Sequence, residues 1–122
     1  MRLRRRMRLT DSDRFQQVRE DGRSWVHPLL VLCALPSDLP YSRFGISVSR
    51  WVGKAVERNR VKRRLREAIR GLWEGVPAGW DMVFVARPPL KGQPFGRVTG
   101  SVSELLRRAD LLLEKKGRGE SP

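Results

Sequence analysis

Cysteine and histidine are almost absent from the sequence, which contains one of each, Cys33 and His27. A single cysteine excludes a disulfide within the chain, and the two residues together cannot supply the four ligands of a Cys/His zinc site. Because disulfides are rare in reducing compartments, this composition favours a cytoplasmic protein. We expect packing roles for both residues, since His27 stands alone before Pro28 and Cys33 lies within an apolar run.

Long hydrophobic runs are also missing. No stretch approaches the roughly 18 uninterrupted apolar residues of a membrane-spanning helix. The basic residues 1–8 are not followed by the apolar segment of a secretion signal. We therefore expect neither secretion nor a membrane partner.

Acidic residues are few: 13 Asp and Glu face 26 Lys and Arg, which gives a formal net charge of +13. In a chain of 122 residues such an excess normally persists because a polyanionic partner neutralises it. Arginine supplies 21 of the 26 cations. This ratio favours bidentate contacts to phosphate, although codon bias in a GC-rich genome explains it equally well. The net charge makes nucleic acid the leading class of partner.

The length suits one domain over residues 1–122, with a basic arm (1–9), a globular core (10–114) and a flexible tail (115–122). Within the core, Thr10 is the expected N-cap of a first helix over residues 11–20.

Three segments have the pattern of β-strands. Residues 29–35 are apolar on both faces, as in a central strand, and residues 80–87 form another apolar run. Residues 43–50 alternate instead. One face of this strand is expected to enter the core, whereas the other is small and polar and could be the floor of a groove; the two sets are Phe44, Ile46 and Val48, and Gly45, Ser47 and Ser49.

Apolar residues at helical spacing predict two further helices, over 57–70 and 97–114. The fold class is then α+β: a small two-layer sandwich in the order α-β-β-(β)-α-β-α, whose antiparallel or mixed sheet is packed against helices.

The helix over 57–70 separates apolar from cationic residues. An apolar stripe contains Val61, Leu65, Ala68, Ile69 and Leu72, and the opposite face carries Asn59, Arg63, Arg66 and Arg70, with Arg60 beside them. Most charged runs are solvated surfaces with internal ion pairs, but here only Glu57 and Glu67 oppose the cations. Basic helices that bind calmodulin or membranes usually carry aromatic anchors, which this apolar stripe lacks.

This helix also carries a resemblance to a known family. Residues 54–67, KAVERNRVKRRLRE, resemble the Arg-Asn-Arg signature of the bacterial ribonuclease P protein component. Further segments follow in the family's order and spacing: 13–18, 30–32, 43–49, 53–56, 81–88 and 105–106. An Arg-rich helix alone is weak support, whereas this ordered set is specific.

The resemblance implies a protein subunit without a catalytic centre of its own. Its partners would be a catalytic RNA, which removes the 5′ leader of precursor tRNA with Mg²⁺ bound mainly by the RNA, and the precursor tRNA itself. No small-molecule substrate is expected. The residues implied to bind the catalytic RNA are Arg58, Asn59, Arg60, Lys62, Arg63, Arg66 and Arg70. Those implied in the leader-binding cleft are Phe15, Arg19, Ser47, Ser49, Arg50, Lys54 and Arg87.

Some positions leave room for other interpretations. The family usually has aromatic residues where this chain has Arg19 and often where it has Cys33, so leader binding here would depend more on charge. Phe15, without the family, is better explained by core packing. Arg58 lies near the apolar side of the helical wheel, which would suit a lead-in to the helix. The four tryptophans are expected as core or loop anchors: Trp25, Trp51, Trp73 and Trp80.

Two alternatives belong to other functional classes. A ribosome-associated structural protein of similar fold would also present a basic surface. A protein-only nuclease would need clustered acidic metal ligands, but the acids of this chain are dispersed along the sequence.

Overall fold

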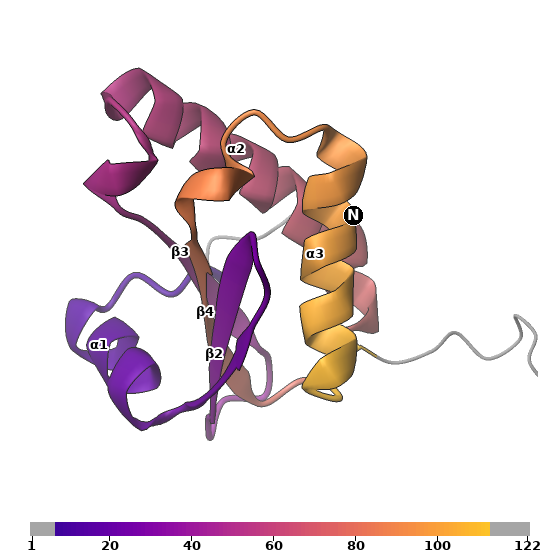
Figure 1. The fold of residues 1–122 in the computed structure, drawn as a ribbon. Helices are drawn as coiled ribbons and strands as arrows, with labels where there is room; N and C mark the ends of the chain where they lie inside the picture. Colours follow the sequence, from indigo (N-terminus) through magenta and orange to yellow (C-terminus); the bar gives the residue numbers. More distant parts are fainter. Residues whose placement is uncertain (1–6, 113–122) are drawn as a thin grey trace, which may run out of the picture.

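The computed structural model describes residues 7–112, which form a four-stranded sheet with three α-helices (Figure 1). The order is α1 (Ser12–Asp21), β1 (Arg23–Val26), β2 (Leu30–Pro36), β3 (Arg43–Val48), α2 (Ala55–Leu72), β4 (Trp80–Ala86) and α3 (Phe95–Arg108). Short 3₁₀ turns lie between them: η2 (Arg50–Val52), η3 (Trp73–Gly75) and η4 (Pro88–Leu90). The α+β class expected from the sequence is confirmed.

The strands lie in the order β1-β2-β4-β3. β2 pairs antiparallel with both β1 and β4, and β3 pairs parallel with β4 across the connection made by α2. The register aligns Gly45 with Val83, and Val83 with Cys33, in one row across the sheet. The next row on the same face joins Ser47, Val85 and Val31.

Helices cover both faces of the sheet. α2 and α3 pack on one face over the main core, whose largest fully buried side chains include Phe84, Leu30, Leu32, Leu65 and Ile69. α1 lies on the other face, over a smaller cluster around Val18, Cys33 and Val83 (Figure 1). Within the segment expected to alternate (43–50), Phe44 is buried in the main core, and Ile46 and Val48 are partly buried against it, so the expected core-facing side of this strand is confirmed.

A buried carboxylate fixes α1 to the sheet. Asp81 of β4 is fully buried and accepts hydrogen bonds from Arg14 Nε of α1 at 2.7 Å and from Arg43 Nε and Nη2 of β3 at 2.9 and 2.7 Å. Burial raises the pKa of Asp81, but the bonds from Arg43 and Arg14 outweigh burial and leave the pKa below its usual value. The same contact with Asp81 raises the pKa of Arg43. Two positive charges are therefore held beside one negative charge beneath α1.

The helix ends differ from those expected. The N-cap of α1 is Asp11 rather than Thr10, because the carboxylate of Asp11 accepts from the backbone N–H groups of Asp13 and Arg14. α2 extends about two residues beyond the expected range at each end. The expectation that the last helix covers residues 97–114 is wrong at its C-terminal end, because α3 ends at Arg108. Asp110, two residues further on, is left-handed (φ 62°), and the N–H of Leu111 returns to Leu106 O at 2.7 Å.

The strands differ as well. β1 was not expected from its sequence, and β3 ends at Val48 rather than at residue 50. At the end of the expected basic arm, Arg8 forms a parallel bridge with Phe44, and Leu9 is buried. The rest of that arm (1–6) and the expected tail (115–122) lie outside the described residues. Within residues 7–112, no helix is both long enough and apolar enough to cross a membrane.

Candidate nucleic-acid interface

The N-terminus of α2 is fixed by Glu57. Its Oε1 accepts from the N–H of Lys54, the N-cap, at 3.1 Å, and its Oε2 lies 3.1 Å from Lys91 Nζ. The hydrogen bond from Lys91, followed by that from Lys54, lowers the pKa of Glu57. One of the two acids of the helix is thereby engaged away from the arginines.

The cationic face of α2 is exposed as expected. Asn59, Arg60 and Arg63 are exposed, and Lys62, Arg66 and Arg70 are partly exposed. In the described part of the chain, Arg70 alone among the α2 cations forms an ion pair, with Glu67 at 2.7 Å. We call these six residues the α2 comb; its charge is largely unneutralised within the protein.

Arg58 differs from the comb. It lies in the first turn of α2, so the lead-in suggested by the helical wheel is wrong. Its Nη1 donates to Gly53 O at 2.8 Å, and its side chain is partly buried against the preceding turn. Arg58 therefore stabilises the junction between η2 and α2.

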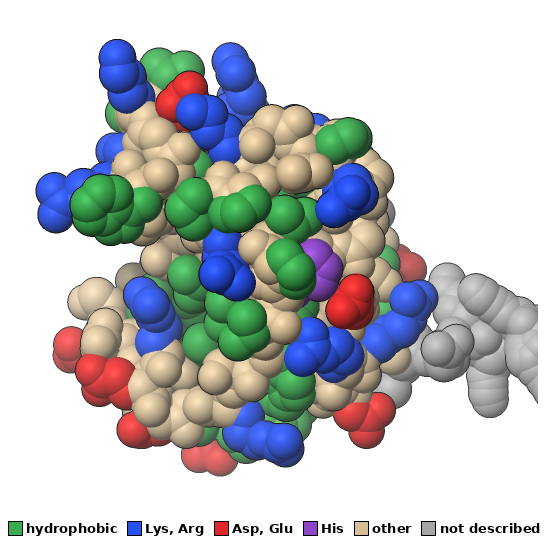
Figure 2. All heavy atoms as spheres, in the orientation of Figure 1, with side chains coloured by type: hydrophobic (Ala, Val, Ile, Leu, Met, Phe, Trp, Pro, Cys, Tyr) green, Lys and Arg blue, Asp and Glu red, His purple; other side chains and the backbone are tan. Residues whose placement is uncertain are grey.

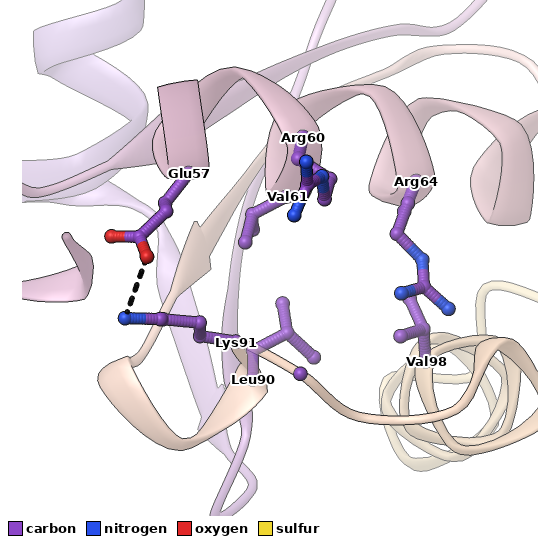
Figure 3. A pocket seen from close by; sticks show the side chains of 8 residues that line it. Glu57, Arg60, Val61, Arg64, Leu90, Lys91 and Val98 are labelled. Atoms are coloured by element: carbon purple, nitrogen blue, oxygen red, sulfur yellow. Dashed lines mark ion pairs between the residues drawn. The ribbon is translucent and has the colours of Figure 1, made fainter. Parts of the chain in front are cut away.

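A pocket of about 190 Å³ lies between α2, η4 and α3 (Figure 3). Arg60 and Arg64 extend from α2 on one side, and Leu90 and Lys91 face them from the other. The Arg64 guanidinium lies 6.0 Å from the ring of Phe95. Neither Arg64 nor Lys91 was among the expected site residues. Lys91 lies in a loop with no motif of its own, so only the fold brings it to α2.

Phe15 joins the α1 side of the sheet to the comb. A methyl group added to Gly45 would lie 2.5 Å from Phe15 Cε2, so the ring rests directly on the backbone of β3. Phe15 also lines a second pocket, of about 140 Å³, together with Arg8 of the N-terminal segment and Lys62 and Arg66 of α2. The aromatic ring expected in the cleft and two cations of the comb thus border one hollow.

Beyond Phe15, the sheet face on the α1 side is open. Val31, Ser47 and Val85 are only partly buried, and Val26 of β1 is 57% exposed. Figure 2 shows hydrophobic side chains in the recess between α1 and the start of α2, with basic side chains around it. We call this region the open cleft; an apolar floor with a basic rim suits an unpaired nucleic-acid strand.

The other expected cleft residues are not all on the floor. Arg19 is exposed at the last turn of α1. Burial raises the pKa of the nearby Cys33 thiol, and the charge of Arg19 lowers it by a smaller amount. Ser49 lies beyond the end of β3, where its Oγ accepts from Trp51 N at 3.2 Å. Arg87 is exposed, and its Nη1 donates to His27 O at 3.2 Å. Arg50 and Lys54 are exposed at the same end of the sheet as η2.

The tryptophans divide into two kinds. Trp73 is a core anchor, with its ring centroid 5.0 Å from that of Phe44, and Trp25 and Trp80 pack against the core while partly exposed. Trp51 is 80% exposed, so the expectation that it is an anchor is wrong.

The single histidine and the single cysteine both have structural surroundings in the fold. His27 Nδ1 accepts from Leu29 N at 3.0 Å, and Cys33 is buried within β2. Within residues 7–112, no three His, Cys, Asp or Glu side chains are close enough to hold a metal ion.

Comparison with known proteins agrees with this geometry. The profile of the Ribonuclease P family matches residues 3–110. The chain belongs to the ribonuclease P protein family. A relative from Herpetosiphon aurantiacus, a ribonuclease P protein component, is 41% identical over 109 residues, covering 89% of each chain. Two solved structures share the fold. The Staphylococcus aureus RNase P protein has a TM-score of 0.79 at 27% identity and covers 87% of this chain and 97% of its own. The Thermotoga maritima RNase P protein has a TM-score of 0.76 at 32% identity and covers 83% and 96%.

These relatives bear on the ribosome-associated alternative that the sequence left open. They support a ribonuclease P protein component with a role in tRNA processing. Nothing in the comparisons favours a ribosome-associated protein.

Proposed function

We propose that the chain binds the catalytic RNA of ribonuclease P through the α2 comb and the 5′ leader of precursor tRNA through the open cleft. The observation that carries this proposal is the exposure of the comb, in which, among the described residues, Arg70 alone forms an ion pair. Such a row of cations repels itself until a polyanion neutralises it.

The catalytic RNA is assigned to the comb because arginine matches the geometry of phosphate. Its planar guanidinium can donate two parallel hydrogen bonds to one phosphate, and Asn59 adds an amide that can read a base edge. The apolar stripe of α2 is buried in the core, with Leu65 and Ile69 inaccessible to solvent. RNA can therefore approach only the cationic side, and the helix is held rigidly while it does so.

The leader is assigned to the open cleft because its floor is partly apolar and uncharged. Phe15 offers a ring for stacking on Gly45, and Ser47 lies two residues further along β3 on the same face and offers a hydroxyl. The basic residues around the floor, Arg19, Arg50, Lys54 and Arg87, would hold the backbone of a single strand. The pocket shared by Phe15, Lys62 and Arg66 lies where the two RNA surfaces meet, so leader and catalytic RNA would be held next to each other.

Catalysis in this proposal resides in the RNA. Mg²⁺ would supply charge stabilisation to phosphodiester hydrolysis and would be bound mainly by the RNA, whose phosphate oxygens are ligands that this hard cation prefers. The protein contributes binding, orientation of the leader and neutralisation of phosphate charge. We place this role in the cytoplasm, as expected from the low cysteine content.

Reconstitution tests the proposal. The full chain is mixed with the catalytic RNA and precursor tRNA at low Mg²⁺, and 5′-end maturation is measured. We expect cleavage only when the RNA is present, with a rate increased by the chain. Cleavage by the chain alone, or no effect of the chain on the RNA, would contradict the proposal.

A paired substitution sharpens this test. Arg63→Ala removes an unpaired cation of the comb, whereas Arg97→Ala removes an exposed cation of α3 outside both proposed surfaces. Only the first variant should need a higher protein concentration to stimulate maturation.

A further inference from the structure

Trp51 has no structural role that explains its exposure. Its side chain is 80% exposed in η2, whereas the other three tryptophans are core or partly buried residues. Tryptophan combines a large apolar ring with a polar N–H, and it is enriched at the surfaces through which proteins bind partners.

The turn that carries Trp51 is firmly fixed. Ser49 caps it through its Oγ, Gly53 N donates to Arg50 O at 3.2 Å, and Val52 is buried in the main core. Arg58 Nη1 ties Gly53 to the first turn of α2. The ring is therefore presented outward by a backbone held from both sides, so little backbone entropy would be lost when it binds a ligand.

The charges around Trp51 favour a polyanion. Residues 50–56 contain Arg50 and Lys54, both exposed, and no acid, and the nearest acid in sequence, Glu57, is engaged by Lys91 and by the N–H of Lys54. Val56, on the next turn, is 68% exposed and adds apolar surface. An aromatic ring between cations matches a nucleotide, whose base stacks while its phosphate pairs.

We propose that Trp51 is a stacking platform for an unpaired RNA base, at the end of the open cleft that follows β3. This inference rests on the proposed function and adds a binding residue at a position that the sequence predicted to be a core or loop anchor. The ligand class is a single-stranded nucleotide, donated either by the leader of precursor tRNA or by an unpaired position of the catalytic RNA.

Substitutions at Trp51 test the inference without disturbing the core. Trp51→Ala should weaken RNA binding by about 5- to 150-fold, the range of one lost base stack, whereas Trp51→Phe should retain most of the affinity. Val56→Ala is the matched control, since it shortens a neighbouring exposed apolar side chain and should change affinity little. Because stacking is uncharged, Trp51→Ala should leave the slope of log K against log salt unchanged.

Three binding measurements identify the source of the base. They compare wild type and Trp51→Ala for the protein with the catalytic RNA alone, for the assembled particle with leader-bearing tRNA, and for the particle with leaderless tRNA. A loss confined to leader-bearing tRNA assigns the base to the leader, and a loss with the catalytic RNA alone assigns it to that RNA. RNA should also quench a component of tryptophan fluorescence that is absent in Trp51→Phe.

Other outcomes overturn the inference. Equal affinity of wild type and Trp51→Ala for all three RNAs, without quenching, removes the stack but leaves the proposed function intact. Failure of the wild type to bind any of these RNAs overturns the proposed function itself. Self-association of the wild type that disappears in Trp51→Ala, with unchanged RNA affinity, assigns the ring to a protein contact instead.

Discussion

Replacing Asp81 with asparagine should destabilise the fold more than any surface substitution. Asp81 is fully buried and receives three hydrogen bonds from Arg14 and Arg43. The variant keeps the volume but removes the negative charge, so two guanidiniums remain together beneath α1. Removing one partner of a buried ion pair typically costs 3–5 kcal/mol. Because both arginine side chains remain 21% exposed and can recruit water, we expect a loss of about 3 kcal/mol, near the lower end of that range.

Urea and thermal unfolding, followed by circular dichroism, measure this loss. A domain of this size gains roughly 2 cal/mol/K of entropy per residue on unfolding, so the melting temperature should fall by about 10–15 °C. The loss should also depend on pH. Since the folded-state pKa of Asp81 lies below the unfolded value near 3.8, its stabilisation is fully present above that value and is lost as the pH falls through the folded pKa. The difference between wild type and variant should therefore shrink at low pH.

Asp38→Asn is the control, because Asp38 is exposed and makes no ion pair among the described residues. Its effect should stay within about 0.5 kcal/mol. A loss of less than about 1 kcal/mol for Asp81→Asn, or a loss that is the same below pH 3 as at pH 7, would refute the reasoning that the charged contact holds α1 in place.

Three further predictions concern the RNA surfaces. Arg63→Ala and Arg66→Ala should each flatten the slope of log K against log salt for the catalytic RNA by about 0.7–0.9. Arg70→Ala should flatten it less, because Arg70 is paired with Glu67. Equal slopes in the wild type and all variants would contradict phosphate contact. Phe15→Ala should weaken binding of leader-bearing precursor tRNA by about 1–3 kcal/mol and leave leaderless tRNA unaffected, as measured in the assembled particle; equal losses for both would place the ring outside the leader site. Gly45→Ala should displace Phe15, because the new methyl group would lie 2.5 Å from the ring. It should therefore weaken binding of leader-bearing precursor tRNA, as Phe15→Ala does, and lower the melting temperature. A variant with wild-type affinity for leader-bearing tRNA would exclude the contact between the Phe15 ring and Gly45 from the site.

The sequence predicts the parts of the fold that depend on local periodicity. The core-facing side of β3 and the apolar stripe of α2 each match the structure, because the backbone period decides which side chains face the core. β1 escapes this reasoning, because its burial pattern is mostly exposed and its strand character comes from pairing with β2. The end of α3 was also missed, because Leu111 continues the apolar pattern of the helix although the chain turns at Asp110.

The site shows the same division. The α2 comb could be predicted because its residues lie on one helix. The contacts of Asp81 with Arg14 and Arg43, and the approach of Lys91 to Glu57, join residues far apart in the sequence, and no local pattern marks them. The exposure of Trp51 was missed because a tryptophan is usually at least partly buried, whereas the 3₁₀ turn η2 buries the neighbouring Val52 and leaves Trp51 in solvent.

The unneutralised comb has a consequence for the lifetime of the free protein. Without its polyanion, the folded chain holds like charges together that the unfolded chain can spread apart, so the folded state is penalised. Binding of RNA would relieve this penalty, and the total stabilisation would be about 2.7 kcal/mol when free RNA is at a hundred times its dissociation constant. Copies in excess of the RNA should then unfold more often and be degraded first, so that proteolysis would adjust the amount of the subunit to the amount of its RNA.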